Sequence, residues 1–201
     1  MNTTQNYDRE TLLPRNRATQ TILDALALDD HLLVKGKTLI DINFNEGYFV
    51  LWGKSHGAKK IIASEGDKEM FEDLKQYIRG KRFKGIQLHH MGFKGLIQMK
   101  PKADIVLALD MLHWATAHGW TLDAAVSAIA AMTTETALIE FPWDCEEPCI
   151  RAQTKLTDFT YHGSKVINLC RRYFTSVSDP IDIRISELGP TSHWVAVYCK
   201  K

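Results

Sequence analysis

The feature that most constrains the fold of this chain is a regular alternation of short β-rich apolar runs with longer segments of helical periodicity. Strands are predicted at residues 38–42, 60–65, 85–90, 104–109 and 136–141. Between them, apolar residues recur at helical spacing, for example over 68–79, where Gly80 ends the pattern. Strands that alternate with helices pair in parallel and are covered by helices on both faces. The alternation therefore predicts an α/β fold.

The end of the chain departs from this alternation. A helix predicted over 164–173 is followed by two apolar segments, 181–187 and 193–199, which a short Gly-Pro connection separates. Two strands joined by so short a turn are most easily antiparallel. The sequence thus predicts a Rossmann-like, mostly parallel seven-stranded sheet with helices on both faces and a C-terminal antiparallel hairpin.

The length of the chain favours one domain. With 201 residues and 45% hydrophobic composition, a single core can bury about 70% of the surface that the unfolded chain exposes. The division predicted within residues 1–201 is a polar arm over 1–14, a helical segment over 15–34 and a Rossmann-like core over 35–201. Within the helical segment, apolar spacing indicates a helix from Arg15 to about Asp30.

Charge, hydropathy and cysteine content exclude several classes of protein. Lys and Arg total 25 against 24 for Asp and Glu, so no overall field attracts nucleic acid or an anionic membrane. The first ten residues are polar and no run reaches the roughly 18 apolar residues of a membrane span, which predicts a cytoplasmic protein without a membrane partner. Four cysteines are too few for a disulfide framework. The pair Cys145 and Cys149 lacks further ligands at zinc spacing, so no metal is expected.

Polar residues follow the first two predicted strands. Asp41 opens the segment DINFNEGYF, and Glu65 follows 24 residues later, at the end of the second strand. Because a carboxylate only accepts hydrogen bonds, Glu65 can bind the two vicinal hydroxyls of a ribose. The alternative for Glu65 is an exposed loop acid or a helix cap. A dinucleotide is less favoured than a smaller nucleoside, because the loop has one glycine where pyrophosphate binding uses three.

The stretch LIDINFNEGYFVLWGKSHGAKKIIASEGD resembles the cofactor-binding opening of class I S-adenosylmethionine-dependent methyltransferases, written strand, Asp, x, Gly, x, x, x, Gly, helix. Asp41 and Gly47 match, whereas Asn43 stands at a family glycine and tolerates a left-handed backbone better than most residues. After the third strand the family has an acid for the adenine amino group, and this chain has HHMGF. The resemblance, over residues 35–201, implies S-adenosylmethionine as cofactor. The implied cofactor-binding residues are Asp41, Asn43, Gly47, Tyr48, Glu65 and Met91.

Two later segments also resemble the family. ADIVLALDMLHWA resembles its fourth strand and the following loop, which implies catalytic roles for Asp110 and His113. His113 is a general base or a brace that holds the loop by hydrogen bonding, and both readings stay open. EFPWDCEEP resembles an acid-rich stretch of glycan and small-molecule methyltransferases. Glu140, Trp114 and Trp143 are therefore expected to bind the acceptor, the alternative being a solvated loop.

The resemblance implies methyl transfer from S-adenosylmethionine to a small-molecule or glycan acceptor. Asn43 and the missing adenine acid support an alternative, a catalytically degenerate methyltransferase fold that serves as a binding or assembly module. A nucleic-acid or protein methyltransferase is the least favoured reading, because it rests on the basic residues between Lys75 and Lys102, which a solvated face also explains. The sequence predicts neither the acceptor atom nor the oligomeric state.

Overall fold

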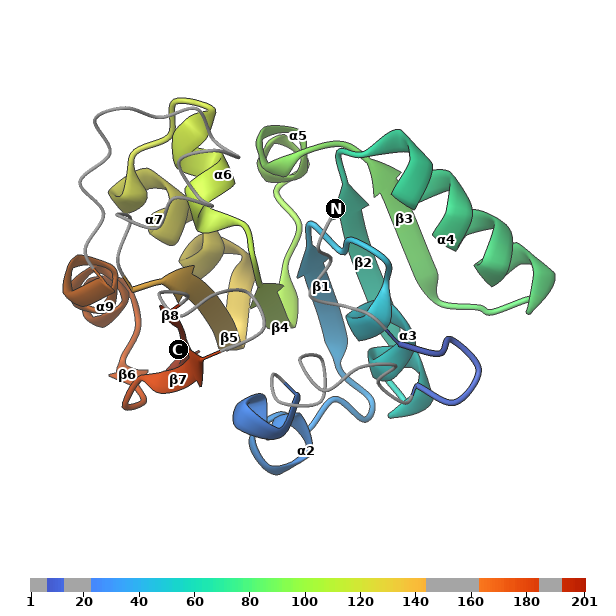
Figure 1. The fold of residues 1–201 in the computed structure, drawn as a ribbon, viewed down its shortest axis with the longest axis horizontal. Coiled ribbons are helices and arrows are strands. Elements are labelled where there is room, and N and C mark those ends of the chain that lie inside the picture. The colour runs from blue at the N-terminus through green and yellow to red at the C-terminus, as the bar shows by residue number, and fades with distance from the viewer. Residues whose placement is uncertain (1–6, 13–22, 144–162, 185–192) are drawn as a thin grey trace.

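The computed structural model describes residues 7–12, 23–143, 163–184 and 193–201, and Figure 1 shows their arrangement. One mixed sheet forms the centre of the molecule. Its strands are β1 (Thr38–Ile42), β2 (Lys60–Glu65), β3 (Ile86–His90), β4 (Ala103–Ala108), β5 (Thr133–Pro142), β6 (Ser176–Val177), β7 (Ile181–Arg184) and β8 (His193–Lys200). The helices are α2 (Leu28–His31), α3 (Tyr48–Ser55), α4 (Lys68–Gly80), α5 (Phe93–Gln98), α6 (Leu112–Ala117), α7 (Leu122–Met132) and α9 (Gly163–Tyr173).

The strand order is β3-β2-β1-β4-β5-β8-β6, with β7 also paired to β8. Strands β1 to β5 pair in parallel, and β8 runs antiparallel to β5 along seven residue pairs. The order reverses between β1 and β4, and open α/β sheets bind ligands at this point, beyond the carboxyl ends of the strands. The predicted fold class is confirmed.

Both faces of the sheet are covered, because alternate residues of the parallel strands are apolar on each side (Figure 1). Ile40 and Ile42 of β1 pack with α5, α6, α7 and α9. Leu39, on the other face of β1, packs with α2, α3 and α4. None of the described helices is long and apolar enough to cross a lipid bilayer.

The sheet has eight strands where seven are predicted, because the strand expected from residue 181 is preceded by a separate short strand, β6. Pro180 lies between β6 and β7 and has no N–H to donate to the ladder. Between β6 and β7, Ser178 still bonds to β8: its amide donates to the Tyr198 carbonyl, and its hydroxyl accepts from the Tyr198 amide. The predicted turn between the two final strands lies outside the described residues.

The N-terminal part differs from the prediction in two ways. The helix expected from Arg15 to about Asp30 is interrupted at Ala27, whose φ of 42° is left-handed and incompatible with a continuous helix. Residues 13–22 lie outside the described part of the chain. Part of the predicted polar arm also belongs to the hydrophobic core. Tyr7 is only 3% exposed and packs in the cluster that contains residues of α3 and α4.

Gly47, the residue before α3, is expected to tolerate no side chain. Its φ is 89°, and a Cβ atom there would lie 2.5 Å from the Cδ2 atom of Leu74, a fully buried side chain that would have to shift. We expect Gly47→Ala to lower the free energy of unfolding by about 2–4 kcal/mol, from backbone strain and overpacking together. Urea denaturation measures the change.

Gly36 supplies the control for backbone strain alone. It has a φ of 77°, with nothing within 4 Å of an added Cβ. Gly36→Ala should therefore cost about 1–2 kcal/mol. Equal losses in the two variants would show that the contact between Gly47 and Leu74 contributes nothing.

Candidate functional site

The turn between β1 and α3 has an unusual backbone. Asn43, Asn45 and Gly47 have φ values of 61°, 52° and 89°, so three of five consecutive residues are left-handed. Phe44 anchors the turn, because its side chain is buried and its amide donates to the Ser64 carbonyl at 3.1 Å. Asn at the family's glycine position is thus compatible with the turn, as asparagine adopts this conformation more readily than other non-glycine residues.

Glu65 is held at the end of β2 by two backbone amides. Its Oε2 atom accepts from the Asn45 amide and its Oε1 atom from the Asp67 amide, both at 2.8 Å. The residue is 4% exposed. A carboxylate has about four acceptor positions, so each oxygen keeps capacity for one further donor. The turn after β1 and the acid after β2 are therefore one structural unit.

Four acids gather near the carboxyl ends of β1, β2, β4 and β5. They are Asp41, Glu65, Asp110 and Glu140, which we call the acid cluster. Burial, together with the charge of Glu65, raises the pKa of Asp41 to about 8 and that of Asp110 to about 7. Burial and the charge of Asp110 raise the pKa of Glu140 to about 8. The cluster is therefore electrostatically unfavourable in its fully ionised form.

Positive charge near the acid cluster is scarce. Among the ion pairs of the described residues, none involves Asp41, Glu65 or Glu140. The Oδ2 atom of Asp41 is buried and has no hydrogen-bond partner within the described part of the chain. A buried carboxylate without a partner is costly, so the cluster can accept a cationic or hydrogen-bond-donating ligand.

His113 lies beside the acid cluster. Its Nε2 atom is 3.7 Å from the Oδ1 atom of Asp110, longer than a hydrogen bond, and neither ring nitrogen has a partner among the described residues. Burial lowers the pKa of His113 to about 4, so the imidazole is neutral at pH 7. The rings of Trp114 and Trp194 each lie 5.4 Å from it, centre to centre.

The loop that carries His113 begins with a strained residue. Asp110 has a φ of 50°, and its amide donates to the Oε2 atom of Glu140 at 3.0 Å. This bond joins the ends of β4 and β5. Strained non-glycine residues concentrate at functional sites, where the surrounding contacts hold them in place.

Three other predicted site residues, Tyr48, Met91 and Trp143, pack elsewhere in the structure. Tyr48 is buried between Tyr7 and Phe49, with ring centroids 5.0 and 5.1 Å away. Met91 packs against the core beside α5. The ring of Trp143 lies against Gly163 at the start of α9. The structure therefore gathers the predicted acids and His113, whereas the ring and packing contacts of Tyr48, Met91 and Trp143 described here are with other residues.

Sequence reasoning missed three residues of this region. Asn45 fixes Glu65, Trp194 packs on His113, and the buried Ser64 hydroxyl has no partner among the described residues. Asn45 carried a signal, because a second asparagine in NFNEG indicates another left-handed position. Trp194 carried no such signal in the sequence, since its contact with His113 depends on the pairing of β8 with β5.

Part of the predicted acceptor segment lies outside the described residues, as do Cys145 and Cys149. Within residues 7–12, 23–143, 163–184 and 193–201, no three His, Cys, Asp or Glu side chains are placed to hold a metal ion. Cys170 and Cys199 are buried free thiols.

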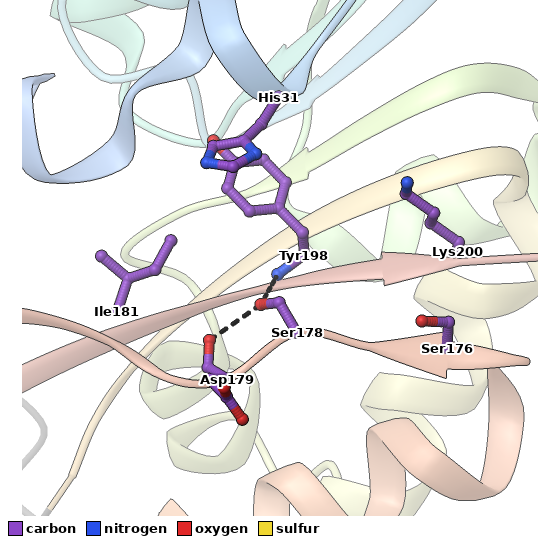
Figure 2. A pocket seen from close by; sticks show the side chains of 7 residues that line it. All are labelled: His31, Ser176, Ser178, Asp179, Ile181, Tyr198 and Lys200. Carbon is purple, nitrogen blue, oxygen red and sulfur yellow. Dashed lines mark hydrogen bonds between the residues drawn. The ribbon is translucent and has the colours of Figure 1, made fainter.

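A cavity of about 330 Å³ lies elsewhere, beside the edge strands (Figure 2). His31 and Tyr198 form one wall, with their ring centroids 4.7 Å apart. Lys200 lies two residues after Tyr198 on the same strand and pairs with Thr136 near the beginning of β5. The acid cluster instead follows the ends of the parallel strands, so this cavity is separate from it.

Comparison with solved structures defines the fold. The chain matches magnesium protoporphyrin IX methyltransferase from Synechocystis, with bound S-adenosylmethionine, at a TM-score of 0.64 and 14% identity, covering 96% of this chain and 79% of that one. It matches the bifunctional kinase-methyltransferase WbdD at 0.69 and 14%, covering 94% and 40%. It matches the 16S rRNA methyltransferase RsmC of T. thermophilus at 0.55 and 13%, covering 92% and 42%.

The protein therefore has the fold of class I S-adenosylmethionine-dependent methyltransferases. The chain spans well under half the length of WbdD and of RsmC. Comparison of the sequence with family models finds no match, and a search of curated proteins finds none.

The raised pKa values of Asp41 and Glu140 predict that stability falls as the pH rises. Between their usual values near 4 and their folded values near 8, the folded state keeps protons that the unfolded state releases. The lowered pKa of His113 makes stability rise with pH, but only between its folded value of about 4 and its usual value of 6.5. From pH 6.5 to 8 the free energy of unfolding should thus fall, by up to about 1.4 kcal/mol per pH unit for each carboxyl.

Urea denaturation at several pH values checks this slope. Asp41→Asn should flatten it, whereas Glu69→Gln, at an exposed position, should not. A stability that rises over the same interval would contradict the burial of these acids in a site without ligand.

Proposed function

We propose that this protein binds S-adenosylmethionine at the acid cluster and transfers its methyl group to a small-molecule or glycan acceptor. One observation carries the proposal: buried carboxyl groups without a counter-charge among the described residues lie at the ligand-binding edge of a class I methyltransferase fold. When bound, S-adenosylmethionine supplies an electrophilic methyl group on a positively charged sulfonium.

The residues present fit this cofactor. It carries an ammonium group and a sulfonium, which suit the acid cluster, and a ribose diol, which suits a carboxylate with free acceptor positions. Glu65 has such positions, because each of its oxygens accepts one backbone amide. The unpartnered Oδ2 atom of Asp41 provides a further acceptor. We assign Glu65 to the ribose, and Asp41 with the turn at Asn43 and Gly47 to the amino-acid end.

Adenine binding rests on Met91, since no acid follows β3. The last residue of β3 is His90, whose ring stacks on Phe71 with the centroids 5.1 Å apart. Its Nε2 atom lies 3.2 Å from the Gly66 carbonyl oxygen. Apolar packing by Met91 and hydrogen bonds from the backbone would replace the missing acid. Tyr48, the first residue of α3, would support the site through its ring contacts with Tyr7 and Phe49.

Asp110 and His113 are assigned to the reacting groups. A neutral imidazole accepts a proton, and His113 is neutral at pH 7, so it is suited to take the proton that an acceptor hydroxyl or amine loses. Asp110 lies beside it and would orient the acceptor. Positioning supplies most of the rate in transfer to a good nucleophile, so the contribution of His113 is expected to be modest.

Glu140, Trp114 and Trp143 are assigned to the acceptor. Carboxyl groups bind sugar hydroxyls, and indole rings stack on the apolar faces of sugars and other rings. The Synechocystis neighbour is a magnesium protoporphyrin IX methyltransferase, and the neighbour RsmC is a 16S rRNA methyltransferase. The fold therefore accommodates different acceptors, and the acceptor must be argued from the site.

The cofactor assignment predicts that S-adenosylmethionine binds with a micromolar Kd in isothermal titration. Asp41→Asn keeps the shape of the side chain but cannot ionise when a cationic ligand binds, so it should weaken binding at least about 10-fold. Glu69→Gln, at the exposed start of α4, is the matched control and should bind as the wild type. Absence of heat at millimolar ligand would instead support the degenerate binding module, for which Asn43 and the missing adenine acid argue.

The acceptor assignment predicts where a labelled methyl group appears. The protein is incubated with methyl-labelled S-adenosylmethionine and separate pools of small molecules with oligosaccharides, of RNA and of protein. Label should enter the first pool, and His113→Asn should lower kcat more than it raises KM. Label in RNA that declines steeply with salt would contradict the assignment and support a nucleic-acid methyltransferase.

A further inference from the structure

The N-terminal stretch reaches back to the turn between β1 and α3. The Tyr7 hydroxyl donates to the Glu46 carbonyl oxygen at 2.9 Å, and the Arg9 Nη2 atom donates to the same oxygen at 3.1 Å. A carbonyl oxygen has two lone pairs, so these two donors saturate it. Residues almost 40 positions away in the chain thus bind one backbone atom of the turn.

Both donors are themselves held in place. Tyr7 is buried, with its ring edge-on to Tyr48 at 5.0 Å. Burial raises the pKa of the Tyr7 phenol, so it remains a donor at every physiological pH. Arg9 also donates to the Asp73 carboxylate at 2.7 Å, and its guanidinium lies 5.6 Å from the ring centroid of Tyr77. The Tyr77 hydroxyl in turn donates to the Arg9 carbonyl at 3.0 Å.

Glu46 occupies a critical position in the turn. The residue before it, Asn45, is left-handed and donates its amide to Glu65, and the residue after it, Gly47, is the N-cap of α3. Left-handed asparagine is less stable than the usual backbone conformations, so the turn persists only where other contacts hold it. Leu74 of α4 contacts the turn at Gly47, and the N-terminal stretch binds it at Glu46.

We propose that Tyr7 and Arg9 are positioning residues that hold the Glu46 carbonyl and so keep the Asn45 amide on the Glu65 carboxylate. Their effect on cofactor affinity rests on the function proposed above, whereas their hold on the turn does not. The competing explanation is that the N-terminal stretch only adds packing and raises the stability of the whole protein.

Cofactor affinity is the first test. Tyr7→Phe keeps the buried ring and removes one donor, and Arg9→Gln removes the other. Each should raise the Kd of S-adenosylmethionine about 3- to 10-fold in isothermal titration, as expected for one lost hydrogen bond. Glu10→Gln is the matched control, because it breaks the exposed pair with Lys81 in the same stretch without touching Glu46, and it should leave the Kd unchanged.

Hydrogen exchange of the protein without cofactor is the second test. In Tyr7→Phe and Arg9→Gln, amides of residues 44–52 should exchange faster than in the wild type, with little change in α7 or β5. Ile129→Val, a buried substitution in α7, serves as the control for general destabilisation. It should leave exchange in residues 44–52 and the Kd close to wild-type values.

The two tests separate failure of this inference from failure of the proposed function. If the wild type binds no S-adenosylmethionine, the proposed function is wrong, and hydrogen exchange alone decides the role of Tyr7 and Arg9. If exchange in residues 44–52 matches the wild type in both variants, or rises equally throughout the chain, the positioning role is wrong.

Discussion

Burial of Asp41, Glu65 and Glu140 at one edge of the sheet, beside the partly exposed Asp110, is the constraint on which the rest of this site depends. Desolvation disfavours the charged forms of Asp41, Asp110 and Glu140, and repulsion from neighbouring acids adds to the effect. A fold selected for stability alone would place polar groups of this kind in water or beside cations. Their position is understandable if the site exists to receive positive charge.

The parallel sheet brings these acids together. Asp41, Glu65, Asp110 and Glu140 stand at or just beyond the carboxyl ends of β1, β2, β4 and β5, which are four neighbouring strands in the middle of the sheet. Helices α3 and α6 begin beyond the same edge, so the loops that lead to them carry the remaining residues of the site. The parallel direction of these strands therefore brings residues far apart in sequence to one edge of the sheet.

The turn after β1 connects the acid cluster with the N-terminal stretch. Its left-handed asparagines are stabilised from three directions: Glu65 of β2, Leu74 of α4, and Tyr7 with Arg9. Asparagine at the family's glycine position therefore preserves the backbone path of the turn. The departure from the family pattern changes the side chain at this point, and the contacts around the turn compensate for the strain of its conformation.

Hydrophobic periodicity and turn residues are local signals, so the fold class, the strand positions to within a few residues and the acids near the strand ends follow from the sequence. Which of these residues meet depends on the tertiary structure. Pro180 separates β6 from β7, Trp194 reaches His113 through the pairing of β8 with β5, and Tyr7 is buried although its neighbours are polar. Such contacts depend on long-range packing, which the local pattern around each residue does not encode.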